Sequence, residues 1–586
     1  MAQGKSPFRF SPRPNRAAEI EWQPWGDEAF ARAREEHRPI LLSLSAVWCH
    51  WCHVMDETTY SDPDIIRLIN QDFIPVRVDQ DVRPDINLRY NMGGWPTTAV
   101  LTPAGDVLTG GTYVPPDAMR DLLGQAREYF TQHATELESR TTPTQQLEPD
   151  PAFVAPPGEA AQEILQSIQT QFDRAYGGLG TAPKFPQVDA WECLLLRFAL
   201  AGEGYAAGMT VRTLDAIAGG GLHDVVEGGF FRYCTTRQWT DPHFEKMLED
   251  NARLMTLFLH AFQVTGDESY REVARKTAEY AKARLMLPSG LFGGSQDADE
   301  TYYGLSAEER AGRPAPAVDE TAYAGANALM VSALLLASAL VDASYRALAL
   351  TALEVLFDRL MGPAGLWHDD REGAVCNWLF DLVAVGHACL DAYELTGDRE
   401  HLTRGRAILA LMDDKLRDHR PGYFDHPAGT SDEGRLQDRQ RPLAENVEAA
   451  RLLRRLGLEG QDLTLIDRAS GLLGAFASVA RQVGTFGSSW VAAETGFAAA
   501  LLDVRLAVPE WHEGQDLRQA AFALFYPERR VRTLLPGDPD REELGIADED
   551  PPALYLCRGT VCAPPVHAPD EIAAAVQALV SGVASV

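Results

Sequence analysis

The chain has 586 residues, of which 45% are hydrophobic and 23% charged, and this length suits about two to four globular domains. Its net charge of −31 at pH 7 argues against nucleic acid as a partner, because phosphates attract Lys and Arg. There is no run of 18 apolar residues and no apolar segment in residues 1–16. The sequence therefore predicts no membrane partner, no secretory signal and a cytoplasmic protein.

The first predicted elements surround a pair of cysteines. Residues 27–36 predict a helix, residues 38–46 a buried strand, and residues 52–60 a helix that follows Cys49 and Cys52. Such a Cys-x-x-Cys motif at a helix start is typical of redox sites, because the helix N-terminus stabilises a thiolate. We expect an exposed Cys49 to attack a disulfide and Cys52 to resolve the mixed disulfide.

Three other interpretations of this motif remain open. Cys49, Cys52 and His53 also fit the Cys-x-x-Cys-His pattern of covalent haem attachment. The cysteines could bind zinc with His50 and His53, although ligands this close in sequence complete a tetrahedron poorly. Both thiols could also be buried and inert. The strand-then-helix context favours the redox interpretation, and we expect no cofactor and no metal site.

The following elements complete an α/β order. Asp62-Pro63 predicts a helix start, residues 73–79 a strand, residues 98–101 and 106–108 two more strands, and residues 118–138 a helix. Pro96 stands directly before a strand, so we expect a cis peptide bond that faces the cysteines. Trp48 and Pro96 would then shape a substrate groove. The order β-α-β and then β-β-α predicts a thioredoxin-like domain over residues 1–140.

Residues 141–158 are rich in Pro, Thr, Gln and Glu and predict a linker, and apolar residues with a helical period follow it. A glycine followed by an apolar or aromatic residue recurs between predicted helix pairs, at intervals of about 50 to 75 residues. It begins at Gly177, Gly228, Gly290, Gly365, Gly422 and Gly484. Six helical hairpins at this spacing predict an all-α (α/α)6 toroid over residues 159–510, with a central pocket.

Candidate site residues of this second domain gather around two loops. Asp241-Pro242 predicts a helix start, which places His243 and Glu245 in a first turn, where they could act as acid and base on a sugar. The helix dipole lowers the pKa of a carboxylate there, which favours a base over an acid. Asp297 and Asp299 could form a second carboxylate group. The charged side chain of Arg232 and the aromatic side chains of Tyr233 and Trp239 could bind a substrate. For each, a structural hydrogen-bond network is the alternative interpretation.

Several motifs resemble the spermatogenesis-associated protein 20-like family of thioredoxin-domain proteins. They are Ser45 to Met55, Gly94 to Thr98, Ala182 to Pro186, Gly228 to Tyr233, Pro242 to Leu248 and Gln296 to Asp299. The resemblance reaches about residue 570. It implies a second domain similar to six-hairpin glycosidases and to N-acylglucosamine and cellobiose epimerases. Apolar residues such as Val225 and Phe231 replace polar ones of that family, which keeps a non-catalytic binding protein open.

Residues 511–586 predict a small C-terminal α/β segment. Residues 522–526, 531–535 and 553–556 predict strands, and residues 570–579 predict a closing helix. Cys557 and Cys562 are either buried thiols, the more economical interpretation, or a second redox pair.

The sequence thus predicts a thiol-disulfide oxidoreductase fused to a six-hairpin domain with a carbohydrate-related role. The alternatives are a sugar epimerase or glycosidase with an auxiliary redox domain, and a binding protein. The expected substrate is a protein disulfide, a sugar or another small molecule.

Overall fold

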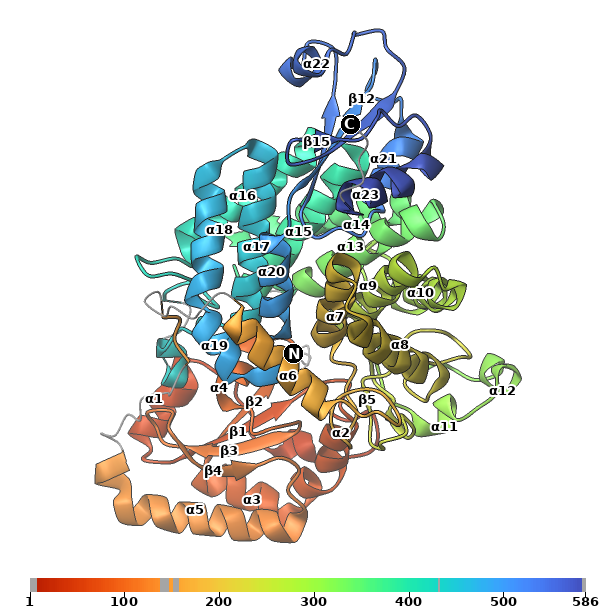
Figure 1. Ribbon diagram of the computed structural model, residues 1–586. Helices are drawn as coiled ribbons and strands as arrows, with labels where there is room; N and C mark the ends of the chain where they lie inside the picture. Colours follow the sequence, from red (N-terminus) through yellow and green to blue (C-terminus); the bar gives the residue numbers. More distant parts are fainter. Residues whose placement is uncertain (1–7, 138–146, 151–157, 372, 430–432, 582–586) are drawn as a thin grey trace.

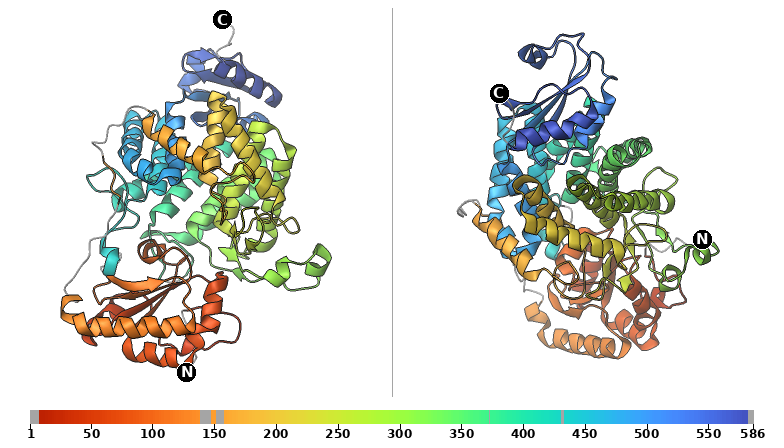
Figure 2. Two further views of the ribbon diagram at one scale, coloured as in Figure 1. Left: turned by 60° about the horizontal axis from the view of Figure 1, so that its bottom comes forward. Right: turned by 45° about the vertical axis from the view of Figure 1, so that its right-hand side comes forward.

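A computed structural model describes residues 8–137, 147–150, 158–371, 373–429 and 433–581. Most of the predicted linker, residues 141–146 and 151–157, lies outside the described residues. A ring of helices occupies the middle of the molecule, and a unit with its own β-sheet lies at each end (Figures 1 and 2). We call these the N-terminal unit, the ring and the C-terminal unit.

The N-terminal unit has the predicted thioredoxin-like order. It consists of α1 (Asp27–Glu35), β1 (Ile40–Ser45), α2 (His50–Glu57), α3 (Pro63–Asp72), β2 (Ile74–Asp79), α4 (Pro84–Tyr90), β3 (Thr97–Leu101), β4 (Val107–Gly111) and α5 (Pro116–Leu137). The sheet order is β2-β1-β3-β4, with β1 parallel to β2 and antiparallel to β3. Every residue of β1 is buried, because separate apolar clusters cover the two faces of the sheet.

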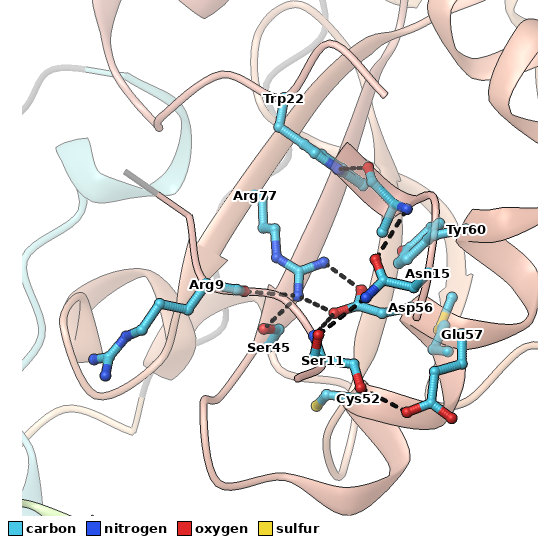
Figure 3. A network of polar contacts seen from close by, with 12 residues as sticks. Arg9, Ser11, Asn15, Trp22, Ser45, Cys52, Asp56, Glu57, Tyr60 and Arg77 are labelled. Carbon is cyan, nitrogen blue, oxygen red and sulfur yellow. Dashed lines mark hydrogen bonds and ion pairs between the residues drawn. The ribbon is translucent and has the colours of Figure 1, made fainter. Parts of the chain in front are cut away.

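A buried ion pair fixes α2 against this sheet. Arg77 of β2 donates to both carboxylate oxygens of Asp56 in α2, at 2.8 and 3.0 Å. Figure 3 shows the same guanidinium reaching Ser45 of β1, while the backbone N–H of Ser11 donates to Asp56. Since both side chains are almost fully buried, either one alone would be an uncompensated charge. The pair therefore holds the helix that carries Cys52.

Six hairpins form the ring in the described chain. The inner helices are α7 (Val188–Ala201), α9 (Leu248–Thr265), α13 (Ala324–Leu340), α15 (Leu379–Thr396), α17 (Leu443–Gly460) and α20 (Ser488–Ala498). Each packs on the next, and α20 returns to α7. Their outer partners are α8 (Gly204–Gly219), α10 (Glu268–Tyr280), α14 (Ser344–Leu360), α16 (Arg399–Lys415), α18 (Leu463–Ala475) and, for α20, α6 (Glu159–Gln171). The (α/α)6 toroid is thus present. The sequence prediction did not include α20.

An asparagine explains why the glycine–aromatic element recurs. Asn251, in the first turn of α9, accepts a hydrogen bond from the N–H of Phe230 and donates one to its carbonyl, at 2.7 and 3.1 Å. Asn327 binds Phe292 in the same way, and Asn446 binds Tyr423. Each asparagine thus pairs the backbone N–H and carbonyl of one buried aromatic residue, which also forms an isolated β-bridge with a nearby residue of the chain. The element is therefore a fixed connection between one hairpin and the next.

The C-terminal unit repeats the topology of the N-terminal unit. It consists of β12 (Leu502–Ala507), α21 (Gln515–Phe522), β13 (Arg529–Leu534), α22 (Pro539–Leu544), β14 (Ala553–Arg558), β15 (Val561–Cys562) and α23 (Ile572–Ser581). Its sheet order is β13-β12-β14-β15, with β12 parallel to β13 and antiparallel to β14. The central strand β12 precedes the expected start of this segment at residue 511. The strand predicted over residues 522–526 is wrong, because α21 ends there at Phe522.

The two sheet units close opposite ends of the ring. The N-terminal unit meets the loops that lead into the inner helices, where Arg89 pairs with Asp425 at 2.7 Å. The C-terminal unit meets the other ends of those helices, where Gln263 of α9 donates to the carbonyl of Ala523. By length and composition, residues Leu463–Gln482 could cross a membrane, but they form α18 and α19 (Ala477–Gln482) on the outside of the ring.

Candidate functional site

Cys49 is the N-cap of α2, as the motif predicts. The N–H of Cys52, the third residue of the helix, donates to Cys49 Sγ at 3.1 Å and also to the Cys49 carbonyl at 3.1 Å. The two cysteines form a disulfide with an S–S distance of 2.29 Å. The peptide bond before Pro96 is cis, as predicted.

The prediction that Cys49 is exposed is wrong. Cys49 and Cys52 are only 4% and 2% exposed, because the ring covers them. Met247, just before α9, packs on the cluster formed by both cysteines and Trp48. The N–H of His50 donates to Glu245 Oε1 of the ring at 3.5 Å. The Cys49–Cys52 pair therefore lies between the N-terminal unit and the loop face of the ring.

Arg232 forms a further part of this cover. Its guanidinium carbon lies 4.4 Å from the ring centroid of Trp48 and 4.8 Å from that of Trp95. Contacts of this kind stabilise by about 0.5–2 kcal/mol, depending on solvent exposure. Arg232, predicted as a substrate ligand, thus joins the ring to both tryptophans beside the cysteines.

His243 and Glu245 lie near each other but not on a helix. The prediction of a first turn is wrong, because Asp241 adopts a positive φ of 53° and Pro242–His243 forms the short strand β6 with Tyr233–Cys234 (β5). Glu245 is buried, and its Oε2 lies 3.8 Å from His243 Nδ1. Burial raises its pKa, but His243 and Arg232 outweigh burial, and the net pKa is lowered. Glu245 is therefore ionised at neutral pH.

The two predicted aspartates differ in environment. Burial and the negative charges of Glu245 and Asp319 raise the pKa of Asp297 to about 7. Its Oδ1 is buried with no hydrogen-bond partner in the described chain. Asp299 instead caps the short helix α11 (Glu300–Tyr303), where it accepts from the N–H of Tyr302 at 2.8 Å. Asp297 and Glu245 thus form a neighbouring acid and base, whereas Asp299 has a structural role.

The predicted aromatic residues also separate into two groups. Trp239 is fully buried, with its indole N–H bonded to the carbonyl of Tyr176, so it offers no platform to a ligand. Trp48 is buried as well. Tyr233 keeps part of its surface and stacks on His243 with ring centroids 4.3 Å apart. Tyr233 also stacks on Phe185, with ring centroids 4.7 Å apart, and of the three it is the one that keeps part of its surface exposed.

A group of charged residues at the same interface was not predicted. Asp79 and Asp81, at the end of β2, face Asp319 of the ring, and burial with the charge of Asp319 raises the pKa of Asp79 to about 6. His368 hydrogen-bonds the carbonyl of Asp81 and the carboxylate of Asp381, both at 2.7 Å. Burial lowers its pKa, but Asp381 and the carbonyl outweigh burial and raise the pKa to about 9. With two acceptors, both ring nitrogens must carry protons.

The positions of these charged residues in the sequence gave some indication of a site. Asp79 and Asp81 directly follow a predicted strand, and His368 follows the glycine–aromatic element at Gly365. Only the packing of the ring on the N-terminal unit shows that they meet.

Comparisons with known proteins support the N-terminal assignment. Residues 2–147 match the family model Thioredox_DsbH, described as "Protein of unknown function, DUF255". Spermatogenesis-associated protein 20 of Homo sapiens is 38% identical over 321 residues, which cover 50% of this chain and 40% of that protein. The Mus musculus protein is 37% identical over 306 residues, covering 48% and 39%. The matches thus span about 40% of these relatives' length.

Solved structures similar to the chain have low sequence identity. Cellobiose 2-epimerase from Bacillus thermoamylovorans is 10% identical, with a TM-score of 0.44, over 54% of this chain and 84% of that one. An α-mannanase of Bacteroides thetaiotaomicron is 12% identical, with a TM-score of 0.43, over 59% and 96%. The six-hairpin ring is established by its own helix contacts. The sequence matches confirm that the chain resembles the spermatogenesis-associated protein 20-like proteins and carries a thioredoxin-like domain at its N-terminal end.

Proposed function

We propose that this protein is a thiol-disulfide oxidoreductase that works at the loop face of its six-hairpin ring. The observation that carries the proposal is the position of Cys49 at the tip of α2, with the N–H of Cys52 aimed at its sulfur and a disulfide joining the two. A helix N-terminus stabilises negative charge, and this stabilisation lowers the pKa of a thiol in the reduced protein.

The reaction moves two electrons between the pair and a disulfide substrate. The Cys49 thiolate attacks one substrate sulfur, the substrate S–S bond breaks, and its other half leaves as a thiolate that takes up a proton. Cys52 then loses its proton and attacks Cys49 Sγ, which releases the second half as a thiol. The pair ends as a disulfide and the substrate as two thiols. An external dithiol returns the pair to its reduced form.

A redox titration tests this proposal. The protein is equilibrated with mixtures of reduced and oxidised dithiothreitol, trapped with iodoacetamide, and the Cys49 peptide is quantified by mass spectrometry. We expect a reversible two-electron transition, a loss of that transition in Cys49→Ser, and an unchanged transition in the Cys557→Ser/Cys562→Ser variant. A Cys49–Cys52 disulfide that does not exchange with dithiothreitol in the folded protein would refute the proposal.

The neighbouring carboxyl groups favour a second candidate function, acid–base chemistry on a sugar hydroxyl or ring. Glu245 has a lowered pKa and Asp297 a pKa raised to about 7, so one carboxylate is ionised while the other can hold a proton. Such a separation is typical of acid–base pairs. A thermal-shift screen with mono- and disaccharides tests this candidate. Shifts that disappear in Asp297→Asn would support it, and a flat response would leave the ring as a non-catalytic binding module.

A further inference from the structure

The ring, and not solvent, covers the surface beside the redox pair. Cys49, Cys52 and Pro96 are buried, and Met247 of the ring packs on the apolar cluster that contains both cysteines. To expose this surface to a folded protein or an extended peptide, the N-terminal unit would have to separate from the ring. That separation would break the buried Arg89–Asp425 pair and the hydrogen bond between His368 and Asp81. The sulfurs are therefore closed to macromolecules.

Small molecules meet a different surface. Arg232, Tyr233, His243 and Asp297 all keep part of their side chains accessible, and they come from ring segments that surround the covered pair. Glu245 binds the N–H of His50, the residue after Cys49. Glu245 itself is buried, but Arg232, which keeps part of its surface, lies on the ring of Trp48, the residue before Cys49. A partly exposed side chain of the ring therefore lies beside the turn that carries the cysteines.

These polar groups have unused bonding capacity. Among the described residues, the Arg232 guanidinium has aromatic contacts but no hydrogen bond or ion pair. In the part of the chain that the structure describes, Asp297 Oδ1 is a buried oxygen without a hydrogen-bond partner, and Glu245 Oε2 makes no hydrogen bond but has His243 Nδ1 at 3.8 Å. Buried polar atoms are costly when unpaired, and such atoms in a site indicate a missing partner. Arg232 can bind a carboxylate, and the two oxygens can accept hydrogen bonds from ammonium or hydroxyl groups.

We propose that the substrate of the redox pair is a low-molecular-weight disulfide that carries both a carboxylate and amino or hydroxyl groups, rather than a protein disulfide. This proposal rests on the oxidoreductase function proposed above and names its substrate class. Arg232 binds the carboxylate, and Glu245 and Asp297 accept hydrogen bonds from the amino or hydroxyl groups. The Cys49 thiolate then attacks the small disulfide, and both halves leave as thiols while the pair becomes a disulfide.

Three disulfide probes test the substrate class with the full-length protein. Reduced protein is mixed with glutathione disulfide, with neutral 2-hydroxyethyl disulfide, or with insulin, and oxidation of the Cys49 peptide is followed by rapid alkylation and mass spectrometry. Each rate constant is divided by the rate of the same probe with dithiothreitol, which removes differences in leaving-group reactivity. We expect glutathione disulfide to exceed hydroxyethyl disulfide about tenfold, the range of one charge-assisted contact, and insulin to be slower still.

Arginine variants test the contact itself. Arg232→Gln should lower the glutathione disulfide rate about tenfold and leave the hydroxyethyl disulfide rate within about twofold, and Arg232→Lys should restore part of the loss. The matched control is Arg313→Gln, which removes an exposed arginine two residues after the C-terminal end of helix α12 (Ala307–Ala311). An equal loss for both small disulfides in Arg232→Gln would show that Arg232 only packs on the tryptophans, and would overturn its assigned role.

The wild-type rates separate this inference from the proposed function. If insulin reacts as fast as glutathione disulfide, or if hydroxyethyl disulfide is equally fast, the pair is an oxidoreductase site but the substrate class is wrong. If no probe oxidises the pair, and oxidised dithiothreitol also fails, the oxidoreductase function itself is wrong. Neither conclusion depends on a variant that might fail to fold.

Discussion

The N-terminal and C-terminal units share one sheet topology but not one chemistry. In both, the first strand lies parallel to the second and antiparallel to the third, and the fourth forms an antiparallel edge. After its first strand the N-terminal unit has the Cys49 turn and α2. The C-terminal unit has residues 508–514 at that place, with no cysteine. Its disulfide, Cys557–Cys562, instead joins β14 to β15 at the sheet edge.

The comparison shows that one sheet topology can carry different side-chain chemistry, because the two units differ in the segment that follows the first strand. In the function proposed above, Cys49 gains its reactivity from a helix start and its selectivity from the ring that covers it. Cys562 lies on an exposed edge strand with neither feature. A single cross-strand disulfide in that position fits a structural staple better than a second redox pair. The economical prediction of two buried thiols is wrong for this pair, since Cys562 is exposed and both are joined in a disulfide.

The largest expected effect comes from the arginine–aspartate pair inside each unit. Asp56→Ala should destabilise the N-terminal unit by about 3–5 kcal/mol, because Arg77 stays buried without its partner. Asp503→Ala removes the shared partner of Arg530 and Arg505 in the C-terminal unit and should cost less, about 2 kcal/mol, because these side chains are less buried.

Hydrogen exchange of peptides from β1 and from β12 in urea measures each unit separately. Equal losses in the two variants would contradict the difference in burial on which this prediction rests. Asp56→Asn, which keeps the shape and one acceptor oxygen, is the control for packing and should fall between wild type and Asp56→Ala.

The next effect concerns pH and the interface of the N-terminal unit with the ring. The pKa of His368 is raised to about 9 in the folded protein. Its protonation therefore stabilises the folded state fully below about pH 6.5, and this stabilisation is lost as the pH rises toward 9. The full shift in the pKa of His368 corresponds to about 3 kcal/mol in the free energy of unfolding. Asp79 and Asp297, whose pKa values are raised to about 6 and 7, also weaken the interface as the pH rises, but below the window of His368.

Unfolding in urea at pH 6.5, 7.5 and 9 checks this pH dependence. His368→Gln should remove most of the loss between pH 6.5 and 9. The stability of the contact between Arg529 of the C-terminal unit and Glu394 of the ring should change little between pH 6.5 and 9, because arginine stays charged. A wild-type interface that strengthens with rising pH would be the opposite of the predicted sign.

A smaller effect distinguishes the two disulfides. Replacing Cys557 and Cys562 with serine opens a short loop, with the cysteines five positions apart, and should destabilise the C-terminal unit by about 2 kcal/mol. Thiol-disulfide exchange at Cys49 should remain unchanged. A large drop in the exchange rate of the double variant would show that the C-terminal pair takes part in the reaction.

The smallest effect concerns helix caps that the units share. Asp62 caps α3 and Asp538 caps α22, each followed by a proline at the first helical position. Asp62→Ala and Asp538→Ala should each cost about 1 kcal/mol, and serine at either position should restore most of it. Thermal unfolding of the four variants measures the cost. A loss well above this in one unit would reveal a tertiary role for that aspartate.

Local sequence patterns predicted most of the helices and strands. The apolar run of β1, the Asp62 cap and the α-helical periods of most hairpins depend on neighbouring residues, so the sequence shows them. β12 was missed because Asp503 and Arg505 interrupt its apolar residues, and these two charges pair with each other at 2.7 Å. α20 was missed because it is short and apolar on nearly every side, which hides its period.

The site was harder to predict, since its properties come from residues far apart in the chain. The burial of Cys49 depends on Met247 and on the packing of the ring, which nothing near the motif indicates. His243 and Glu245 were expected on a helix because Asp-Pro usually starts one, yet the positive φ of Asp241 turns the chain into β6 instead. The sequence thus predicted the position of the cysteine pair at a helix start, but it did not predict that the ring would bury the pair.

The most direct test of the account compares alkylating reagents of two sizes on the fully reduced protein at pH 6. We predict that iodoacetamide labels Cys49 rapidly, because the helix N-terminus keeps its thiolate populated, while a polyethylene-glycol maleimide labels Cys562 but not Cys49. Labelling of Cys49 by the bulky reagent would contradict closure by the ring. A Cys49 that resists iodoacetamide until the pH exceeds about 8.5 would contradict the activated thiolate itself.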